Sequence, residues 1–235
     1  MPGSKPVLWQ IRMSHYSEKA RWALDYKGVE HERRAPPPGA HMLVALTLTR
    51  GRHKTFPVLQ LDGENIGDST GIIEALERRY PEPGLYPEDD EERRRALELE
   101  DWFDEELRPH IRLLVFHEAT RSTFVGLRYG VKSAEAAELA RGKVLAALER
   151  LEAELDGNEY LVGDRYSVAD LTAAALFYPL VLPPEGPLLP DPPEGFESFR
   201  APLAERAGYR WVEEMFRRHR QPIQAGDAVP VHGRG

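Results

Sequence analysis

The chain has 235 residues, 41% of them hydrophobic and 30% charged, a composition typical of globular proteins and sufficient for one large or two small domains. The net charge of −8 argues against nucleic-acid binding, and the absence of cysteine excludes disulfides, thiolate metal sites and a cysteine nucleophile. No apolar run approaches the about 20 residues of a membrane helix. The N-terminus lacks the apolar core of a signal peptide, so we expect a cytoplasmic protein.

The first part of the chain alternates short strands with helices. Residues 7–11 predict a strand, and residues 14–26 predict a helix that stops at Gly28, a residue suited to the position after a helix end. A second strand is expected within residues 29–34 and a short helix within residues 42–46. Strands that alternate with helices indicate an α/β domain.

A hairpin completes this domain. Residues 58–61 are an apolar strand, and Asp62-Gly63 is a strong signal for a two-residue hairpin turn, which needs positive φ angles. Pro57 cannot donate to a strand ladder, so it belongs at the first residue of the strand or in the loop before it, where a cis peptide bond would fix the loop. Asp68 and Ser69 then open a helix that runs to about residue 80.

The pattern changes after three prolines and a glycine within residues 81–87. Long helical patterns follow. Residues 91–120 predict one long helix kinked at Pro109 or a broken pair of helices, residues 134–155 predict another, and a third begins at the capping box of Ser167 and Asp170. The last of these is apolar nearly all round, so we expect it at the centre of a bundle. Prolines make residues 181–196 a loop, and a final helix ends near Arg220.

These patterns predict an α/β thioredoxin-like N-terminal domain and an all-α helical-bundle C-terminal domain. The expected boundaries are residues 1–80 for the first domain, 81–88 for a linker, 89–221 for the helical domain and 222–235 for a flexible tail.

Three motifs in the same order resemble the cytosolic glutathione S-transferase superfamily. They are residues 14–24, Phe56-Pro57-Val58-Leu59 followed by Asp68-Ser69, and residues 160–171 with their capped helix. The resemblance covers about residues 6–180 and leaves the subclass open. It implies a glutathione-binding first domain, a second domain that binds a hydrophobic substrate, and a homodimer.

A glutathione transferase must form a thiolate from a thiol whose free pKa is about 8.5. A hydrogen bond to the sulfur and the positive end of a helix both lower that pKa. Ser14 stands between the first strand and the first helix, so the resemblance implies that its hydroxyl donates to the sulfur. Ser14 and Ser17 have the spacing of the Cys-x-x-Cys pair of thioredoxin, with Ser17 at the inner position. Ser17 and Tyr16 are rival donors to the sulfur, and the plain alternative makes Ser14 a helix N-cap.

The resemblance also implies a set of glutathione contacts. Val58, after Pro57, pairs its backbone with the cysteinyl unit, and Asp68 with Ser69 receives the γ-glutamyl end. The family more often has Glu where this chain has the shorter Asp68, and helix capping is the alternative role of this pair. Lys54 is a candidate for the glycyl carboxylate or else a surface lysine.

The helical domain is expected to supply the wall for the second substrate. With Tyr16, the candidates are His110, Leu113, Leu114 and His117, which recur along one helix. The same stripe also fits bundle core. No metal site is expected, since the two histidines lie two turns apart without an accompanying carboxylate motif.

We therefore expect a glutathione S-transferase that activates the thiol of glutathione, its co-substrate, for attack on an electrophilic hydrophobic small molecule. Isomerase and dehalogenase variants stay open. Chemistry through a mixed disulfide with the protein is excluded because the chain has no cysteine. The alternative is a non-catalytic protein of this type that binds an apolar ligand or a partner, or an enzyme that uses another low-molecular-weight thiol.

Overall fold

The computed structural model describes residues 5–119, 133–187 and 191–220. The chain divides into two compact units. The first runs to Leu85 and also takes in the segment from Pro184 and the C-terminal residues from His219, and the second comprises Tyr86–Pro183 and Leu189–Arg218. The boundary at Leu85 falls within the segment predicted as a linker, and the predicted tail lies outside the described residues.

The described residues of the first unit form a four-stranded mixed sheet with three helices. Its elements in chain order are β1 (Val7–Trp9), α1 (His15–Tyr26), β2 (Glu32–Arg34), α2 (His41–Leu48), β3 (Val58–Leu61), β4 (Glu64–Gly67) and α3 (Ser69–Arg79). The strand order is β2-β1-β3-β4, with β1 parallel to β2 and antiparallel to β3, and β3 antiparallel to β4. The predicted thioredoxin-like domain is confirmed.

Local signals in the sequence set these elements. The α1 helix begins after Ser14, its N-cap, and ends before Gly28. The φ of Gly28 is 62°, which is outside the range of a right-handed helix, so the helix cannot continue through it. The turn between β3 and β4 has positive φ at both central residues, 48° at Asp62 and 84° at Gly63, as the hairpin prediction requires.

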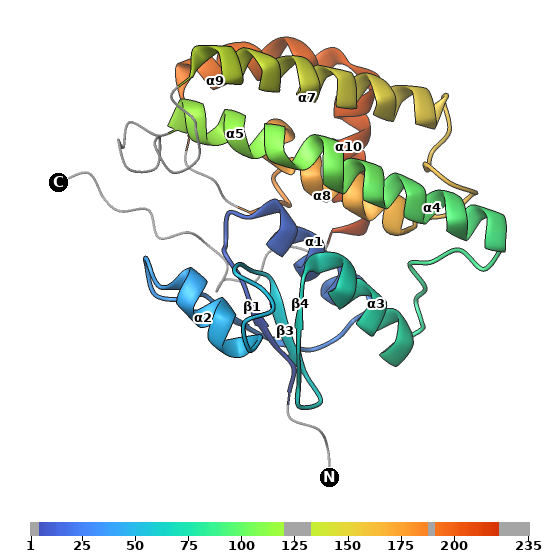
Figure 1. Ribbon diagram of the computed structural model, residues 1–235. Helices are drawn as coiled ribbons and strands as arrows, with labels where there is room; N and C mark the ends of the chain where they lie inside the picture. Colours follow the sequence, from blue (N-terminus) through green and yellow to red (C-terminus); the bar gives the residue numbers. More distant parts are fainter. Residues whose placement is uncertain (1–4, 120–132, 188–190, 221–235) are drawn as a thin grey trace. The chain divides into compact units, whose positions relative to one another are not determined.

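The sheet is covered on both sides, with α2 and α3 on opposite sides of it (Figure 1). Under α2 lies a small core in which Ala45, Phe56 and Val58 are buried and Trp9 and Leu48 pack against them. On the other side α1 packs against α3, and their buried residues include Trp22, Leu24 and Ile72. Burial of these apolar side chains is the main favourable term that holds the unit together.

In its described residues, the second unit is all helical, as predicted. It comprises α4 (Asp90–Trp102), a π-helical segment (Phe103–Leu107), α5 (Arg108–Ala119), α7 (Ala134–Leu155), α8 (Val168–Val181), α9 (Glu194–Arg200), a 3₁₀ segment (Ala201–Glu205) and α10 (Ala207–His219). Figure 1 shows α5 and α7 running side by side. The predicted break at Pro109 takes the form of the π segment just before it, because the proline cannot donate to the preceding turn.

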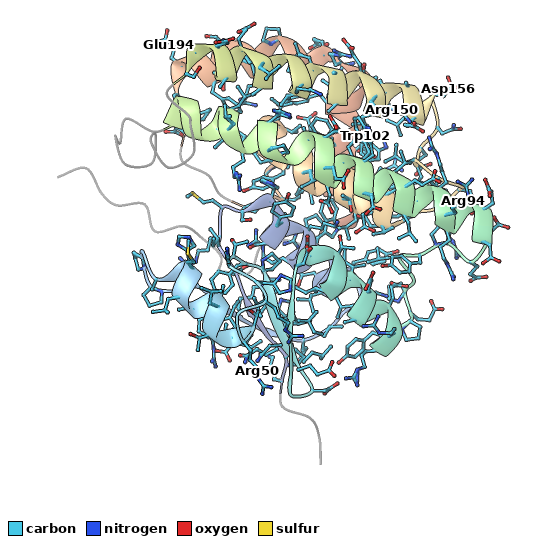
Figure 2. All side chains as sticks on the ribbon, viewed as in Figure 1. Arg50, Arg94, Trp102, Arg150, Asp156 and Glu194 are labelled. Atoms are coloured by element: carbon cyan, nitrogen blue, oxygen red, sulfur yellow. The ribbon has the colours of Figure 1, made fainter. Side chains whose placement is uncertain are left out.

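Every residue of α8 is buried, so this helix is the centre of the unit. It opens with the predicted capping box, in which the Asp170 carboxylate accepts the backbone N–H of Ser167 at 2.8 Å. At the periphery, the Arg150 guanidinium lies 5.7 Å from the ring centroid of Trp102 (Figure 2). The loop predicted to reach Phe196 is shorter than expected, because α9 begins at Glu194.

Within the described ranges, no helix is both long enough and apolar enough to cross a membrane.

Candidate functional site

One edge of the sheet in the first unit gathers the N-terminal candidates. Trp9, the last residue of β1, pairs with Val58, the first of β3, and Val58 pairs in turn with Gly67, the last of β4. The loop that leads to Ser14 therefore leaves the sheet beside Pro57, and the chain enters Asp68 at the same edge. Residues distant in sequence are brought together there by strand register alone.

Ser14 is the N-cap of α1. Its hydroxyl oxygen accepts the backbone N–H of Ser17 over 3.4 Å, and its own N–H donates to the carbonyl of Ile11 at 2.9 Å. The capping role foreseen as the plain alternative is thus present. Within the described parts of the chain, nothing accepts the proton of this hydroxyl, so capping leaves Ser14 able to donate a hydrogen bond.

The two rival donors have different surroundings. Ser17 is fully buried, and its hydroxyl oxygen accepts the backbone N–H of Ile11 at 3.1 Å, which braces the loop from the inside. Tyr16 is half-buried, and its ring lies 4.5 Å from that of His15 between centroids. Ser17 therefore serves the shape of the loop, and Tyr16 packs against its neighbour.

Pro57 and Val58 lie in the centre of this edge. The Phe56–Pro57 peptide bond is cis, the isomer considered for this position on the basis of the sequence. The Val58 side chain is fully buried in the core under α2. Only the backbone of Val58 is thus available to a ligand.

Asp68 has an unusual backbone. Its φ of 72° and ψ of 142° lie near a region that is essentially restricted to glycine and that costs other residues about 1–3 kcal/mol. Although Asp68 precedes α3, its side chain makes no capping hydrogen bond, and among the described residues its only hydrogen-bond partner is the Ser69 hydroxyl at 3.5 Å. The capping alternative is therefore wrong for Asp68, whose carboxylate is exposed at the sheet edge.

Ser69, the first residue of α3, is fully buried. The N-terminal turns of α1 and α3 are joined at this edge, since the buried Lys19 ammonium donates to the Thr70 hydroxyl at 3.2 Å. Two helix N-termini thus face the same end of the sheet, where backbone N–H groups and helix dipoles favour negatively charged groups.

Lys54 is exposed, and the sequence did not single out its neighbour His53. The ring of His53 packs so closely over Gly67 that an added Cβ at that glycine would lie 2.3 Å from its Cδ2 atom. This places an imidazole next to the backbone that carries Asp68. The glycine before Asp68 was the only local signal of such a close approach.

The candidates for the second substrate lie in the second unit. Leu114 on α5 is fully buried, Leu113 is half-buried, and the His117 side chain lies outside what the structure describes. His110 is half-buried, and burial lowers its pKa, an effect that the charge of Lys143 increases. At Leu114 the bundle-core alternative is therefore correct.

Among the side chains that the structure describes, no three His, Cys, Asp or Glu residues are placed to hold a metal ion.

The two units define the class of protein: a thioredoxin-like domain joined to a helical domain, with the candidate site at one sheet edge. The glutathione S-transferase N-terminal domain matches residues 8–84, and the glutathione S-transferase C-terminal domain matches residues 108–201. The chain belongs to the glutathione S-transferase superfamily. The expected class, an enzyme of the glutathione transferase type, is confirmed.

Two relatives and one solved structure illustrate what the chain is similar to. Maleylacetoacetate isomerase of Rattus norvegicus is 30% identical over 177 residues, which cover 74% of this chain and 77% of that protein. FtsZ-localized protein A of Caulobacter vibrioides is 31% identical over 110 residues, 47% of each chain. A solved glutathione S-transferase from Methylobacterium radiotolerans, in complex with glutathione sulfonate, shares the fold with a TM-score of 0.65 at 21% identity and covers 93% of this chain and 96% of that one.

Proposed function

We propose that the protein binds glutathione at the sheet edge of its first unit and activates the thiol for attack on an electrophilic carbon. The observation that carries the proposal is Asp68. A non-glycine residue in a conformation near the glycine region, with an exposed carboxylate that caps no helix, has no structural reason to be an aspartate. A carboxylate held in this way is suited to the ammonium group of the γ-glutamyl unit.

The rest of the tripeptide follows from the same edge. The backbone of Val58, beside the cis proline, is suited to pair with the cysteinyl amide, and Ser69 with the N-terminus of α3 is suited to the α-carboxylate. Lys54 and the newly found His53 lie on the loop before β3 and are the candidates for the glycyl carboxylate. The cysteinyl sulfur then faces the start of α1.

Ser14 is the proposed donor to the sulfur. One oxygen can accept from the N–H of Ser17 and at the same time donate its proton to a thiolate, so the cap and the sulfur contact are compatible. The hydroxyl does not ionise. It stabilises the negative sulfur in place together with the positive end of α1, and each unit by which the thiol pKa falls corresponds to about 1.4 kcal/mol.

The reaction that these groups support is addition of the thiolate to an electron-poor carbon. A carbon–sulfur bond forms, and the electron pair of a conjugated double bond, or a leaving group, departs from that carbon. In conjugation by addition, the carbanion that forms takes up a proton from solvent and the protonated adduct is the product; in conjugation by substitution, the leaving group departs with its bonding electron pair. In a cis–trans isomerisation the adduct rotates about the former double bond and the thiolate leaves again, and the relatives named maleylacetoacetate isomerase make maleylacetoacetate the first substrate to test.

The decisive experiment is a pH titration of thiolate absorbance for glutathione bound to the protein. We expect a thiol pKa at least one unit below the free value, restored toward it in Ser14→Ala. The matched control is Ser133→Ala, because Ser133 caps α7 in the second unit with the same chemistry, its hydroxyl accepting the N–H of Ala136 at 3.1 Å. A lowered pKa that survives in Ser14→Ala would move the role to Tyr16, Ser17 or the helix amides.

A second function is favoured by a different observation. The α2 helix is apolar on most of its surface, yet Met42 is 38% exposed and Leu43 is 68% exposed, so this face is suited to bind a partner or an apolar ligand. The resemblance to FtsZ-localized protein A points to the same class of function. Calorimetry separates the two proposals, since absence of binding at millimolar glutathione would rule out the enzyme as stated. A homodimer, a cytoplasmic location and the use of another thiol stay predictions.

A further inference from the structure

A chain of buried charges runs through the first unit behind the proposed thiol site. Its members alternate in sign and come from α1, β2 and the C-terminal segment: Arg21, Glu18, Arg220, Asp25 and Arg33. Glu18 is fully buried, and Arg21 and Arg220 are 1% and 4% exposed. Charges are rarely buried unless they are paired, because the loss of hydration is costly.

Arg220 is the central link of this chain. Its Nε donates to Glu18 Oε1 at 2.6 Å, and one terminal nitrogen donates to Asp25 Oδ2 at 2.6 Å. A single guanidinium therefore bridges two carboxylates that lie seven residues, about two turns, apart on α1. Only arginine has a planar fork of donors that can do this with short bonds to both.

One branch of the chain leads away from the site. Asp25 also accepts from Arg33, at 2.6 and 2.7 Å to its two oxygens, and Arg33 Nε donates to His31 Nε2 at 2.9 Å. The other ring nitrogen of His31 lies 2.7 Å from the carbonyl of Val29, which makes it the donor and the imidazole neutral. Burial lowers the pKa of this histidine, in agreement with that assignment.

The other branch leads to the loop that carries Ser14. Glu18 Oε2 accepts from Arg21 Nε at 2.7 Å. The two terminal nitrogens of Arg21 donate to the loop. One donates to Gln10 Oε1 at 2.5 Å, and the other donates to the carbonyl of Arg12 at 3.1 Å. Arg12 lies two residues before Ser14, so the charge chain ends on the backbone of the proposed thiol-activating loop.

The C-terminal segment has a second attachment to α1. The indole N–H of Trp22, which is fully buried, donates to the carbonyl of His219 at 3.0 Å. This bond places residue 219 against the helix and brings Arg220 to the two carboxylates. The position of Arg220 is thus fixed by the backbone of the preceding residue and by its own side chain.

We propose that Arg220 is a positioning residue for the thiol-activating loop, an inference that rests on the proposed function. Its bond to Glu18 Oε1 holds that carboxylate so that Glu18 Oε2 meets Arg21 through Nε alone. Arg21 then keeps both terminal nitrogens for Gln10 and Arg12. Without Arg220, Glu18 has a buried oxygen with no cation, Arg21 turns to meet both oxygens of the carboxylate, and the loop loses the donors that fix Ser14.

The test compares the wild type with Arg220→Gln, Arg220→Lys and the control Arg217→Gln. Arg217 lies in the last turn of α10, where it pairs with Glu214 and its side chain is 64% exposed. Arg217→Gln therefore removes one positive charge close in sequence to Arg220 but leaves the ion pairs of the buried charge chain in place. Arg220→Lys keeps the charge but has no fork, so it can serve one carboxylate at a time.

Two readouts are measured on each variant. The first is the thiol pKa of bound glutathione, which we expect to rise by half a unit or more toward the free value in Arg220→Gln, to rise less in Arg220→Lys and to stay unchanged in Arg217→Gln. The second is amide hydrogen exchange at Ile11 and Ser14, whose N–H groups close the loop on Ser17 and Ile11. We expect these amides to exchange about tenfold faster in Arg220→Gln, because the loop opens more often.

The outcomes separate this inference from the proposed function. If the wild type lowers the thiol pKa and Arg220→Gln leaves both the pKa and the loop exchange unchanged, the positioning role is wrong and the proposed function stands. If the wild type does not bind glutathione, the proposed function fails, and the exchange readout, which needs no ligand, still decides whether Arg220 orders the loop. Should Arg220→Gln not fold, Arg220→Lys supplies the comparison, and unchanged exchange there overturns the proposal.

Discussion

Ser14 and Ser17 are linked directly and also through Ile11. The backbone N–H of Ser17 donates to the Ser14 hydroxyl. The Ser17 hydroxyl accepts the backbone N–H of Ile11, and the Ile11 carbonyl accepts the N–H of Ser14. Three hydrogen bonds thus close a small loop around the proposed thiol donor. Ser14 is the proposed donor, and Ser17 maintains the loop from within.

The first prediction concerns Ser17→Ala. Loss of the hydroxyl leaves the partly buried N–H of Ile11 without its acceptor, which should lower the free energy of unfolding by about 1–3 kcal/mol. The thiol pKa of bound glutathione should change less than in Ser14→Ala. Denaturant unfolding and the thiolate titration measure the two effects.

Thr47→Ala is the control for Ser17→Ala. Its hydroxyl donates to the carbonyl of Leu43 on an exposed face of α2, so we expect a change within about 0.5 kcal/mol. An equal loss of stability in both variants, or a larger pKa change in Ser17→Ala than in Ser14→Ala, would contradict the division of roles.

The second prediction separates stability from binding at Asp68. In Asp68→Gly the backbone conformation is no longer costly, and relief of about 1–3 kcal/mol is offset in part by the entropy that glycine loses on folding. We expect stability equal to or up to about 1 kcal/mol above the wild type, and at least tenfold weaker glutathione binding through loss of a charge-assisted hydrogen bond. Calorimetry and chemical unfolding on the same samples provide the measurements.

Asp156→Gly is the matched variant for Asp68→Gly. Asp156 also has a positive φ, 43°, at the end of α7 in the second unit (Figure 2). Its replacement should leave glutathione affinity unchanged. If Asp68→Gly binds glutathione as tightly as the wild type, the carboxylate does not meet the ligand and the proposed site is wrong in that part.

The third prediction tests the contact between Gly67 and His53. A Cβ at residue 67 cannot fit 2.3 Å from the imidazole, so Gly67→Ala should displace the ring and lower stability by about 1–3 kcal/mol. If the clash is the cause, the double variant Gly67→Ala/His53→Ala should recover most of the loss, and a double-mutant cycle measures the coupling.

Gly71→Ala is the control for Gly67→Ala. Its new Cβ meets Ile66 at an ordinary 3.9 Å, so the variant should stabilise α3 by about 0.5–1 kcal/mol. Additive effects at residues 67 and 53 would refute the clash.

Local signals in the sequence were sufficient for much of the fold. The stop at Gly28, the turn at Asp62-Gly63 and the helix over residues 134–155 were all predicted, because each depends on residues that are neighbours along the chain. The shape of the break at Pro109 was not predicted, since a proline shows where a helix is interrupted and not how the turn before it adjusts.

Much of the candidate site could not be predicted for the opposite reason. Glu18 is a good helix former, and nothing near it in the sequence announces that it is buried against Arg220, 202 residues later. The backbone of Asp68 likewise has no local signature, because aspartate is not the residue expected at its φ and ψ. A contact between distant segments decides the burial of Glu18.

The last prediction is a pH dependence that originates at Asp170. Burial raises the pKa of this carboxyl to about 6, while hydrogen bonds from Leu161 and Ser167 to the carboxylate act in the opposite direction. The unfolded chain has the ordinary value of 3.8, so between about pH 4 and pH 6 the folded state binds more protons than the unfolded state. The contribution of Asp170 to stability is therefore largest below pH 4 and falls by up to about 3 kcal/mol as the pH rises through 6.

Asp170→Asn isolates this contribution, because asparagine does not titrate. The free energy of unfolding, measured by denaturant titration at pH 4, 5, 6 and 7, should favour the wild type over Asp170→Asn most strongly at pH 4 and progressively less up to pH 6. Above about pH 7 the difference should be constant, since Asp170 is then ionised in both states. A difference that grows as the pH rises would mean that the three donors to the carboxylate, at 2.8 Å each, outweigh the cost of burying the charge and hold its pKa below 3.8.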